Sequence, residues 1–206
     1  STGWHTQFAD LNNDGRLDLF IAKGNVERMP EFSAVDPDNL LLGLADGTFS
    51  EQGGAAGIAL ARRGRGAVIE DFNADGMLDL LVVNREEPVS LFRNLGKAID
   101  GGFAPVGNFL AVELDNGAIN PNAIGAKISV TALGVVQTHT VQIGGGHASV
   151  QLGFEHFGLA GAQRAQVRVK WPGQDWSRPY QVTANSFVVI TRGAADVKYW
   201  QPQQAR

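Results

Sequence analysis

The chain has 206 residues, 44% of them hydrophobic and 18% charged, which is ordinary for a globular protein with a real core. Its formal net charge of −4, with no basic block beyond "RRGR" at 62–65, argues against nucleic acid and anionic membranes as partners. The absence of cysteine excludes disulfides and thiol chemistry, and no apolar run approaches the roughly 20 residues of a membrane span.

The first predicted unit contains "FADLNNDGRLDLF" at 8–20, in which oxygen-bearing side chains alternate around a glycine. That glycine, Gly15, permits a sharp turn that a Cβ atom would obstruct. In a tightly curled backbone, the side chains at positions one, three, five and nine converge, and the carbonyl of position seven can point inward. Such a shell of hard oxygens suits Ca²⁺. The predicted ligands are the side chains of Asp10, Asn12, Asp14 and Asp18 and the carbonyl of Arg16.

The stretch that follows predicts further short elements. "NLLLGLADGTFSE" at 39–51 predicts a hairpin, because Asp46-Gly47 is a turn signal between two β-rich runs. "GGAAGIALAR" at 53–62 allows a short helix.

The acidic pattern then returns 61 residues later (71 − 10) in "IEDFNADGMLDLL". Without a cation, the carboxylates of one loop repel one another by on the order of 1–4 kcal/mol per pair. Asx-type turns use Asp, Asn and Gly without a metal, but two copies in the same register favour two Ca²⁺ sites. The predicted ligands of the second site are Asp71, Asn73, Asp75 and Asp79 and the carbonyl of Met77.

Other metal-binding motifs fit these loops less well. An EF-hand needs a bidentate Glu at position twelve, where this chain has Ile21 and Val82, and its loop is flanked by helices. Mg²⁺ demands stricter octahedral geometry, and zinc would need a Cys/His cluster that is absent. Calcium remains the favoured ion.

The residues of both loops resemble a known repeat. "FADLNNDGRLDLFIA" and "VIEDFNADGMLDLLVVN" resemble FG-GAP (VCBS-type) repeats, and "DNLLLGLADGTFSE" and "PVSLFRNLG" resemble later strands of the same unit. Such repeats form the blades of integrin-α-like β-propellers. The resemblance implies that the loop between the first two strands of each blade binds Ca²⁺ through the ligands named above.

The second half loses the acidic loops and becomes continuous strand and turn. Period-2 alternation predicts strands at 126–133, 166–171 and 186–193. Three landmarks, 122–126, 156–159 and Trp171-Pro172, resemble the ASPIC/UnbV domain, which follows FG-GAP repeats in the cartilage acidic protein family. From the residues alone, we expect Gly125 and Gly158 to permit turns, and Trp171 and Phe157 to fill a β core.

The predicted fold is all-β: two propeller-type blades at 1–97, a linker at 98–107 and a β-sandwich-like ASPIC/UnbV domain at 108–206. Two blades are fewer than a closed propeller typically needs, so we expect either a fragment of a longer protein or self-association. Because millimolar extracellular calcium saturates even weak sites, we expect an extracellular, periplasmic or cell-surface location, with any signal peptide outside this chain.

The function favoured by the sequence is a non-catalytic, calcium-stabilised structural or interaction module. Its expected partner is a protein or a glycan at a surface, or a second copy of the chain. No nucleophile elbow, P-loop, dinucleotide-binding fingerprint or zinc motif indicates an enzyme. The alternative is an accessory carbohydrate-binding or carbohydrate-active protein with its site on the blade loops. His139 and His156 fit packed positions, whereas His147, after three glycines, fits a loop and is the histidine to test for function.

Overall fold

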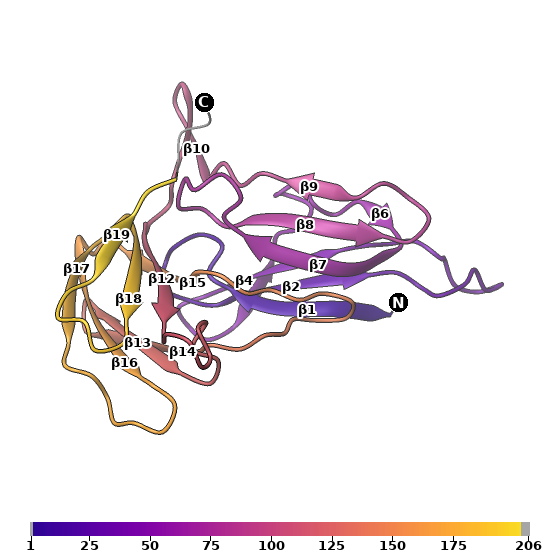
Figure 1. The fold of residues 1–206 in the computed structure, drawn as a ribbon. Coiled ribbons are helices and arrows are strands. Elements are labelled where there is room, and N and C mark those ends of the chain that lie inside the picture. The colour runs from indigo at the N-terminus through magenta and orange to yellow at the C-terminus, as the bar shows by residue number, and fades with distance from the viewer. Residues whose placement is uncertain (1, 203–206) are drawn as a thin grey trace.

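The computed structural model describes residues 2–202, and every regular element within them is a β-strand (Figure 1). The prediction of an all-β chain is therefore confirmed. Residues 2–202 contain no helix that is long and apolar enough to cross a membrane.

The first half of the chain forms two antiparallel sheets, which we call sheet 1 and sheet 2. Sheet 1 has the order β1 (Gly3–Ala9), β2 (Asp18–Lys23), β4 (Asn39–Gly43) and β5 (Phe49–Glu51). Sheet 2 has the order β7 (Gly64–Glu70), β8 (Asp79–Asn84) and β9 (Ser90–Phe92). A short pair, β3 (Asp36–Pro37) with β6 (Ala61–Arg62), accompanies them.

Sheets 1 and 2 share one hydrophobic cluster. In β2 the buried Phe20 and Ala22 alternate with partly exposed neighbours, as expected for a strand with one face in a core. They pack with apolar residues of β7 and β8, namely Ala67, Ile69, Leu80 and Val82. The two acidic loops connect β1 to β2 and β7 to β8, so each joins the first two strands of its sheet.

The sequence predicted a hairpin and a short helix in the first half of the chain. The hairpin at 39–51 is confirmed as β4 and β5, with Gly47 at φ +83° in the turn. The short helix at 53–62 is wrong. The amides of Ala56 and Ile58 bond to Gln52 and Gly53, but Gly57 at φ +74° ends this single turn, and β6 begins at Ala61.

The segment predicted as a linker, 98–107, contains most of a hairpin. Strand β10 (Lys97–Ile99) pairs with β11 (Gly102–Ala104), and Ile99 lies opposite Gly102. The intervening Asp100-Gly101, with Gly101 at φ +83°, is a two-residue hairpin signal that the sequence reading missed.

The second half forms two facing four-stranded sheets, which we call the sandwich. One has the order β15 (Glu155–Ala160), β12 (Asn108–Asp115), β18 (Ser186–Thr191) and β19 (Lys198–Trp200). The other has the order β14 (Val135–Thr140), β13 (Lys127–Ala132), β16 (Arg164–Lys170) and β17 (Tyr180–Thr183). All pairs are antiparallel except β12 with β18.

The three strands predicted in this half are found as β13, β16 and β18. Their inward residues, with Phe157 and Trp171 as predicted, fill a cluster shared by both sheets. Gly125 lies in a turn at φ +88°, also as predicted. The prediction that Gly158 lies in a turn is wrong, because Gly158 lies within strand β15.

The loop between β14 and β15, residues 141–154, extends from the sandwich along β1 (Figure 1). Its Ser149 Oγ accepts the amide of Ala67 at 3.0 Å, and Gln151 Nε2 donates to the carbonyl of Ile69 at 2.7 Å. Strands β1 and β7 are edge strands of their sheets. The loop therefore satisfies backbone groups of an edge that would otherwise be open to pairing with another chain.

Candidate metal centre

The two acidic loops, loop 1 (residues 10–18) and loop 2 (71–79), fold around their first aspartate in the same way. In loop 1, Asp10 accepts the amide of Gly15 at 2.7 Å and the amide of Asp14 at 3.1 Å. In loop 2, Asp71 accepts the amides of Gly76 and Asp75 at the same two distances, 2.7 and 3.1 Å. The first carboxylate of each loop therefore holds the turn closed.

Positions three and five also match between the loops. Asn12 Oδ1 accepts the amide of Asp14 at 3.0 Å, as Asn73 Oδ1 does from Asp75. Asp14 in turn accepts the amide of Arg16 at 2.9 Å. The matching bond in loop 2 runs from the amide of Met77 to Asp75 at 3.0 Å. The side chains of positions one, three and five thus each accept a backbone amide of their own loop.

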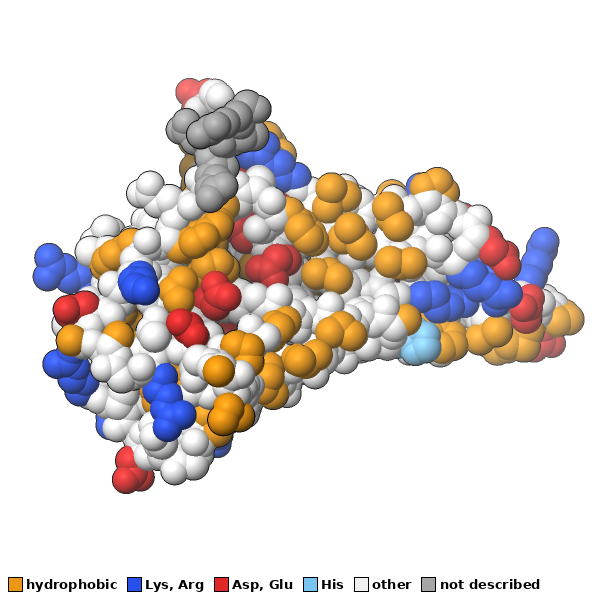
Figure 2. Space-filling view, viewed as in Figure 1, with side chains coloured by type: hydrophobic (Ala, Val, Ile, Leu, Met, Phe, Trp, Pro, Cys, Tyr) orange, Lys and Arg blue, Asp and Glu red, His pale blue; other side chains and the backbone are white. Residues whose placement is uncertain are grey.

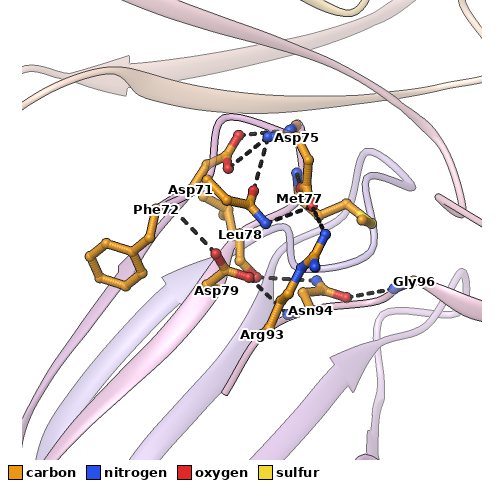
Figure 3. A network of polar contacts seen from close by, with 11 residues as sticks. Asp71, Phe72, Asp75, Met77, Leu78, Asp79, Arg93, Asn94 and Gly96 are labelled. Carbon is orange, nitrogen blue, oxygen red and sulfur yellow. Dashed lines mark hydrogen bonds and ion pairs between the residues drawn. The ribbon is translucent and has the colours of Figure 1, made fainter. Parts of the chain in front are cut away.

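The aspartate at position nine of each loop accepts two backbone amides, one from its own loop and one from a later segment. Asp79 accepts the amide of Phe72 in its own loop at 3.3 Å and the amide of Asn94, just past β9, at 2.8 Å (Figure 3). Asp18 does the same with the amides of Leu11 at 2.8 Å and Gly43 at 2.9 Å. Both carboxylates are buried, and these bonds connect loop 1 to β4 and loop 2 to the segment just after β9.

The backbone explains why glycine occupies position six. Gly15 and Gly76 have φ of +86° and +85°, a region in which glycine carries no steric penalty. Position four is also left-handed, with Asn13 at φ +59° and Ala74 at φ +56°. The glycine at position six was predicted from the sequence, whereas the left-handed conformation at position four was not.

The loop carboxylates lie in an unfavourable electrostatic environment. The pKa of Asp10 is raised to about 7, chiefly by burial and also by the charges of Asp14 and Asp18, against the opposing effect of the amides it accepts. Burial likewise raises the pKa of Asp18 to about 6, with Asp14 adding to the effect. The pKa of Asp71 is also raised, by burial first and then by Asp75 and Asp79. A cation bound among these groups would stabilise their charged forms.

In each loop, an arginine side chain forms an ion pair with the carboxylate at position five. Asp14 pairs with the guanidinium of Arg16, and Asp75 lies 3.2 Å from Arg93 Nη2. Figure 3 shows Arg93 beside Asp75. The two arginines come from different places in their repeats, so the common feature is the carboxylate that attracts them.

The donor set fits calcium in its chemistry. Each loop offers three carboxylates, one amide oxygen and a backbone carbonyl, all of them the hard oxygens that Ca²⁺ prefers. Among residues 2–202, no three His, Cys, Asp or Glu side chains already converge as a metal-binding group. Ligation by the ten predicted residues therefore stays a prediction, and the structure supplies the folded loops on which it rests.

The raised pKa values predict a pH dependence in the absence of metal. Asp10 and Asp18 bind more protons in the folded state than in the unfolded state between about pH 4 and about pH 7. In a chelating buffer these two carboxyl groups should therefore lower the free energy of unfolding as pH rises through this window, outweighing the opposite effect of the histidine His156, whose pKa is lowered. Urea titrations at pH 4.5, 5.5 and 7.0 measure this fall. With saturating calcium, the change in the free energy of unfolding with pH should be smaller. An equal pH dependence with and without calcium would contradict the prediction.

The histidines occupy distinct positions. His156 Nε2 lies 2.7 Å from Asn13 Oδ1, and burial lowers the pKa of His156 to about 3, which keeps the ring neutral. His139 stacks on Phe157 with ring centroids 4.2 Å apart and pairs with Glu155 at 3.2 Å. His147 lies exposed in the 141–154 loop, as predicted, with its ring 4.9 Å from that of Trp4.

Comparison with known proteins gives two family matches along the chain. Residues 10–82 match the FG-GAP-like repeat family, and residues 117–197 match the family described as ASPIC and UnbV. "Cartilage acidic protein 1" from Mus musculus and from Homo sapiens is 28% identical over 171 residues, which cover 80% of this chain and 24% of the relative. The chain therefore spans about a quarter of the length of these curated relatives. Both resemblances identified in the sequence are confirmed.

Proposed function

We propose that this chain, whose residues match an FG-GAP-like repeat and an ASPIC/UnbV domain, is a calcium-binding, non-catalytic interaction module that works outside the cell. The observation that carries this proposal is a set of six backbone-to-side-chain hydrogen bonds, each of which recurs at the matching place in loops 1 and 2. A turn needed only for connection would not require crowded, buried carboxylates in the same order twice.

In this proposal calcium has a structural role. The ion neutralises the crowded carboxylates of each loop and fixes the connection between the first two strands of each sheet. Because loops 1 and 2 occupy equivalent places, we infer that sheets 1 and 2 are propeller-type blades. Homology to cartilage acidic protein 1 supports an extracellular location, where millimolar calcium saturates sites with dissociation constants of about 10⁻⁴–10⁻³ M.

Isothermal titration calorimetry with calcium tests the proposal. The wild-type chain should bind two ions, Asp14→Ala and Asp75→Ala one each, and the double variant none. Asp175→Ala removes an exposed carboxylate outside both loops and should keep two sites. Absence of binding to the wild-type chain, or single variants that retain both sites, would refute the proposal.

The exposed surface of sheet 2 supports the interaction part of the proposal. Figure 2 shows hydrophobic side chains gathered over the region of β7–β9. Val83, Val89 and Leu91 there are 43%, 59% and 62% exposed. Light scattering on the purified chain distinguishes self-association through this surface, which gives a concentration-dependent dimer, from a monomer that would need a different protein.

A second candidate function, carbohydrate binding, is favoured by a cleft between sheet 1 and the sandwich. The cleft has a volume of about 440 Å³ and combines polar side chains with the exposed ring of Phe8. Among the described residues, no Lys or Arg lines it, whereas the carboxyl groups of Asp10 and Glu155 do, which disfavours an anionic ligand and leaves a neutral saccharide as the candidate. Its polar lining includes Thr6, Gln7, His139, Thr140, Gln142, Gln151 and Glu155.

A glycan array followed by saturation-transfer NMR tests this second candidate. If the cleft binds a neutral saccharide, combining Gln142→Ala with Glu155→Gln should weaken binding about tenfold or more, since both side chains line the cleft. Glu113→Gln, on a strand that does not line the cleft, is the matched control. Saccharide binding that is unchanged in the double variant, or no binding on the array, would count against the cleft.

A further inference from the structure

We propose that the first calcium site is coupled to the second half of the chain: strand β15 of the sandwich holds Asp10 in its ligating position, so calcium binding at loop 1 and docking of the sandwich favour each other. This inference rests on the proposed calcium function. It adds a thermodynamic link between that site and a domain that supplies none of its predicted ligands.

The closest approach is between Gly158 and Asp10. A Cβ atom built on Gly158 would lie 1.8 Å from Asp10 Oδ2 and 2.7 Å from the Cα atom of Asn13. Asp10 cannot easily move away, because its carboxylate already accepts the amides of Asp14 and Gly15. The backbone of β15 therefore lies directly against the first ligand of loop 1. This contact, and not a turn, explains the glycine at 158.

The second connection passes through Asn13, which is buried at position four of loop 1. Its carbonyl accepts the amide of Ala160 at 2.9 Å, and its Nδ2 donates to the carbonyl of Gly76 at 2.8 Å. Because Nδ2 is used in that way, Oδ1 faces His156 and accepts from Nε2 at 2.7 Å. One side chain thus joins loop 1, loop 2 and β15.

Loop 2 lacks this arrangement. Its position four is Ala74, whose side chain has no polar group to bridge to the sandwich. The sandwich touches loop 2 at position six, where a Cβ atom on Gly76 would lie 2.0 Å from the ring of Phe109. The first aspartate is therefore covered by the sandwich backbone in loop 1, which predicts that the coupling is stronger at loop 1 than at loop 2.

The test uses Gly158→Ala in the full chain, with each site isolated in turn. Asp75→Ala leaves loop 1, and Asp14→Ala leaves loop 2. Calcium titration calorimetry should show that Gly158→Ala weakens loop 1 about tenfold or more, because the added methyl group displaces Asp10, and changes loop 2 less than about twofold. Gly161→Ala is the matched control, since its Cβ atom would meet no atom within 4 Å.

The reciprocal effect is measured by hydrogen–deuterium exchange. In the Asp75→Ala chain, calcium at loop 1 should slow amide exchange in β15, and Gly158→Ala should abolish that slowing. If Gly158→Ala does not fold, His156→Leu removes the bond to Asn13 without adding bulk to β15, and should weaken loop 1 in the same direction.

The outcomes separate this inference from the proposed function. Selective weakening of loop 1, with slowed exchange in β15, supports the inference. A folded Gly158→Ala or His156→Leu chain with unchanged affinity at loop 1, or with equal losses at both loops, overturns the coupling and leaves calcium binding intact. A wild-type chain that binds no calcium overturns both.

Discussion

Saturating calcium should raise the thermal stability of this chain strongly. At a hundredfold excess over the dissociation constant, each site adds about 2.7 kcal/mol to the free energy of unfolding, so two sites add about 5 kcal/mol. At about 2–4 °C per kcal/mol for a chain of this size, the melting temperature should rise by roughly 10–20 °C. Scanning calorimetry in calcium and in EDTA measures the shift.

Two comparisons make this result specific to the loops. Asp14→Ala and Asp75→Ala should each lose about half of the shift, and the double variant should lose nearly all of it. Magnesium at equal concentration should stabilise the chain less, because it gives up its water ligands reluctantly. A shift of equal size in the double variant would mean that calcium acts elsewhere on the molecule.

The second large effect concerns Phe109, at the junction of the sandwich with loop 2. Its buried ring stacks on His156 at a centroid distance of 5.6 Å, meets Phe187 at 5.3 Å and covers Gly76. Phe109→Ala should therefore lower the free energy of unfolding by about 3–5 kcal/mol, the usual cost of removing a buried aromatic ring. Urea denaturation followed by tryptophan fluorescence measures this loss.

Phe103→Ala is the matched control, because Phe103 is 59% exposed on the β10–β11 hairpin. That substitution should change the free energy of unfolding by less than about 0.5 kcal/mol. Similar costs for the two variants would show that the junction contributes little to stability, and would weaken the view that the two halves support each other.

The sequence was most informative where a local rule determines the structure. The left-handed turn at Gly15 follows from the close spacing of its acidic neighbours, and the hairpin at Asp46-Gly47 follows from its turn signal. Alternating apolar residues likewise located β13, β16 and β18. In each case the residues that fix the conformation lie within a few positions of one another, so no long-range contact needed to be known.

The missed features depend on contacts between distant segments. Gly158 was expected in a turn, yet the space it leaves is needed by Asp10, almost 150 residues earlier (158 − 10). Asn13 was not singled out, since its partners His156 and Gly76 become neighbours only in the folded chain. The predicted ligand Asp18 also accepts the amide of Gly43, and this bond requires the pairing of β2 with β4.

The sequence contains only two repeats, which left open what covers the edge strands of their sheets, and the 141–154 loop packs against these strands. Two isolated sheets with open inner edges would invite pairing with other chains. Ser149 and Gln151 satisfy backbone groups of β7, and Ser149 also bonds to His5 of β1 at 3.1 Å. A loop of the sandwich, which no local sequence rule assigns to that place, thus covers the β7 edge of sheet 2 and contacts β1 through side chains.

The most direct test of the central claim is a crystal structure of the chain grown in millimolar calcium, with an anomalous difference map collected at long wavelength. We expect two peaks, one among the oxygens of Asp10, Asn12 and Asp14, and the other among those of Asp71, Asn73 and Asp75. Well-ordered loops with no anomalous peak in either would contradict the central claim.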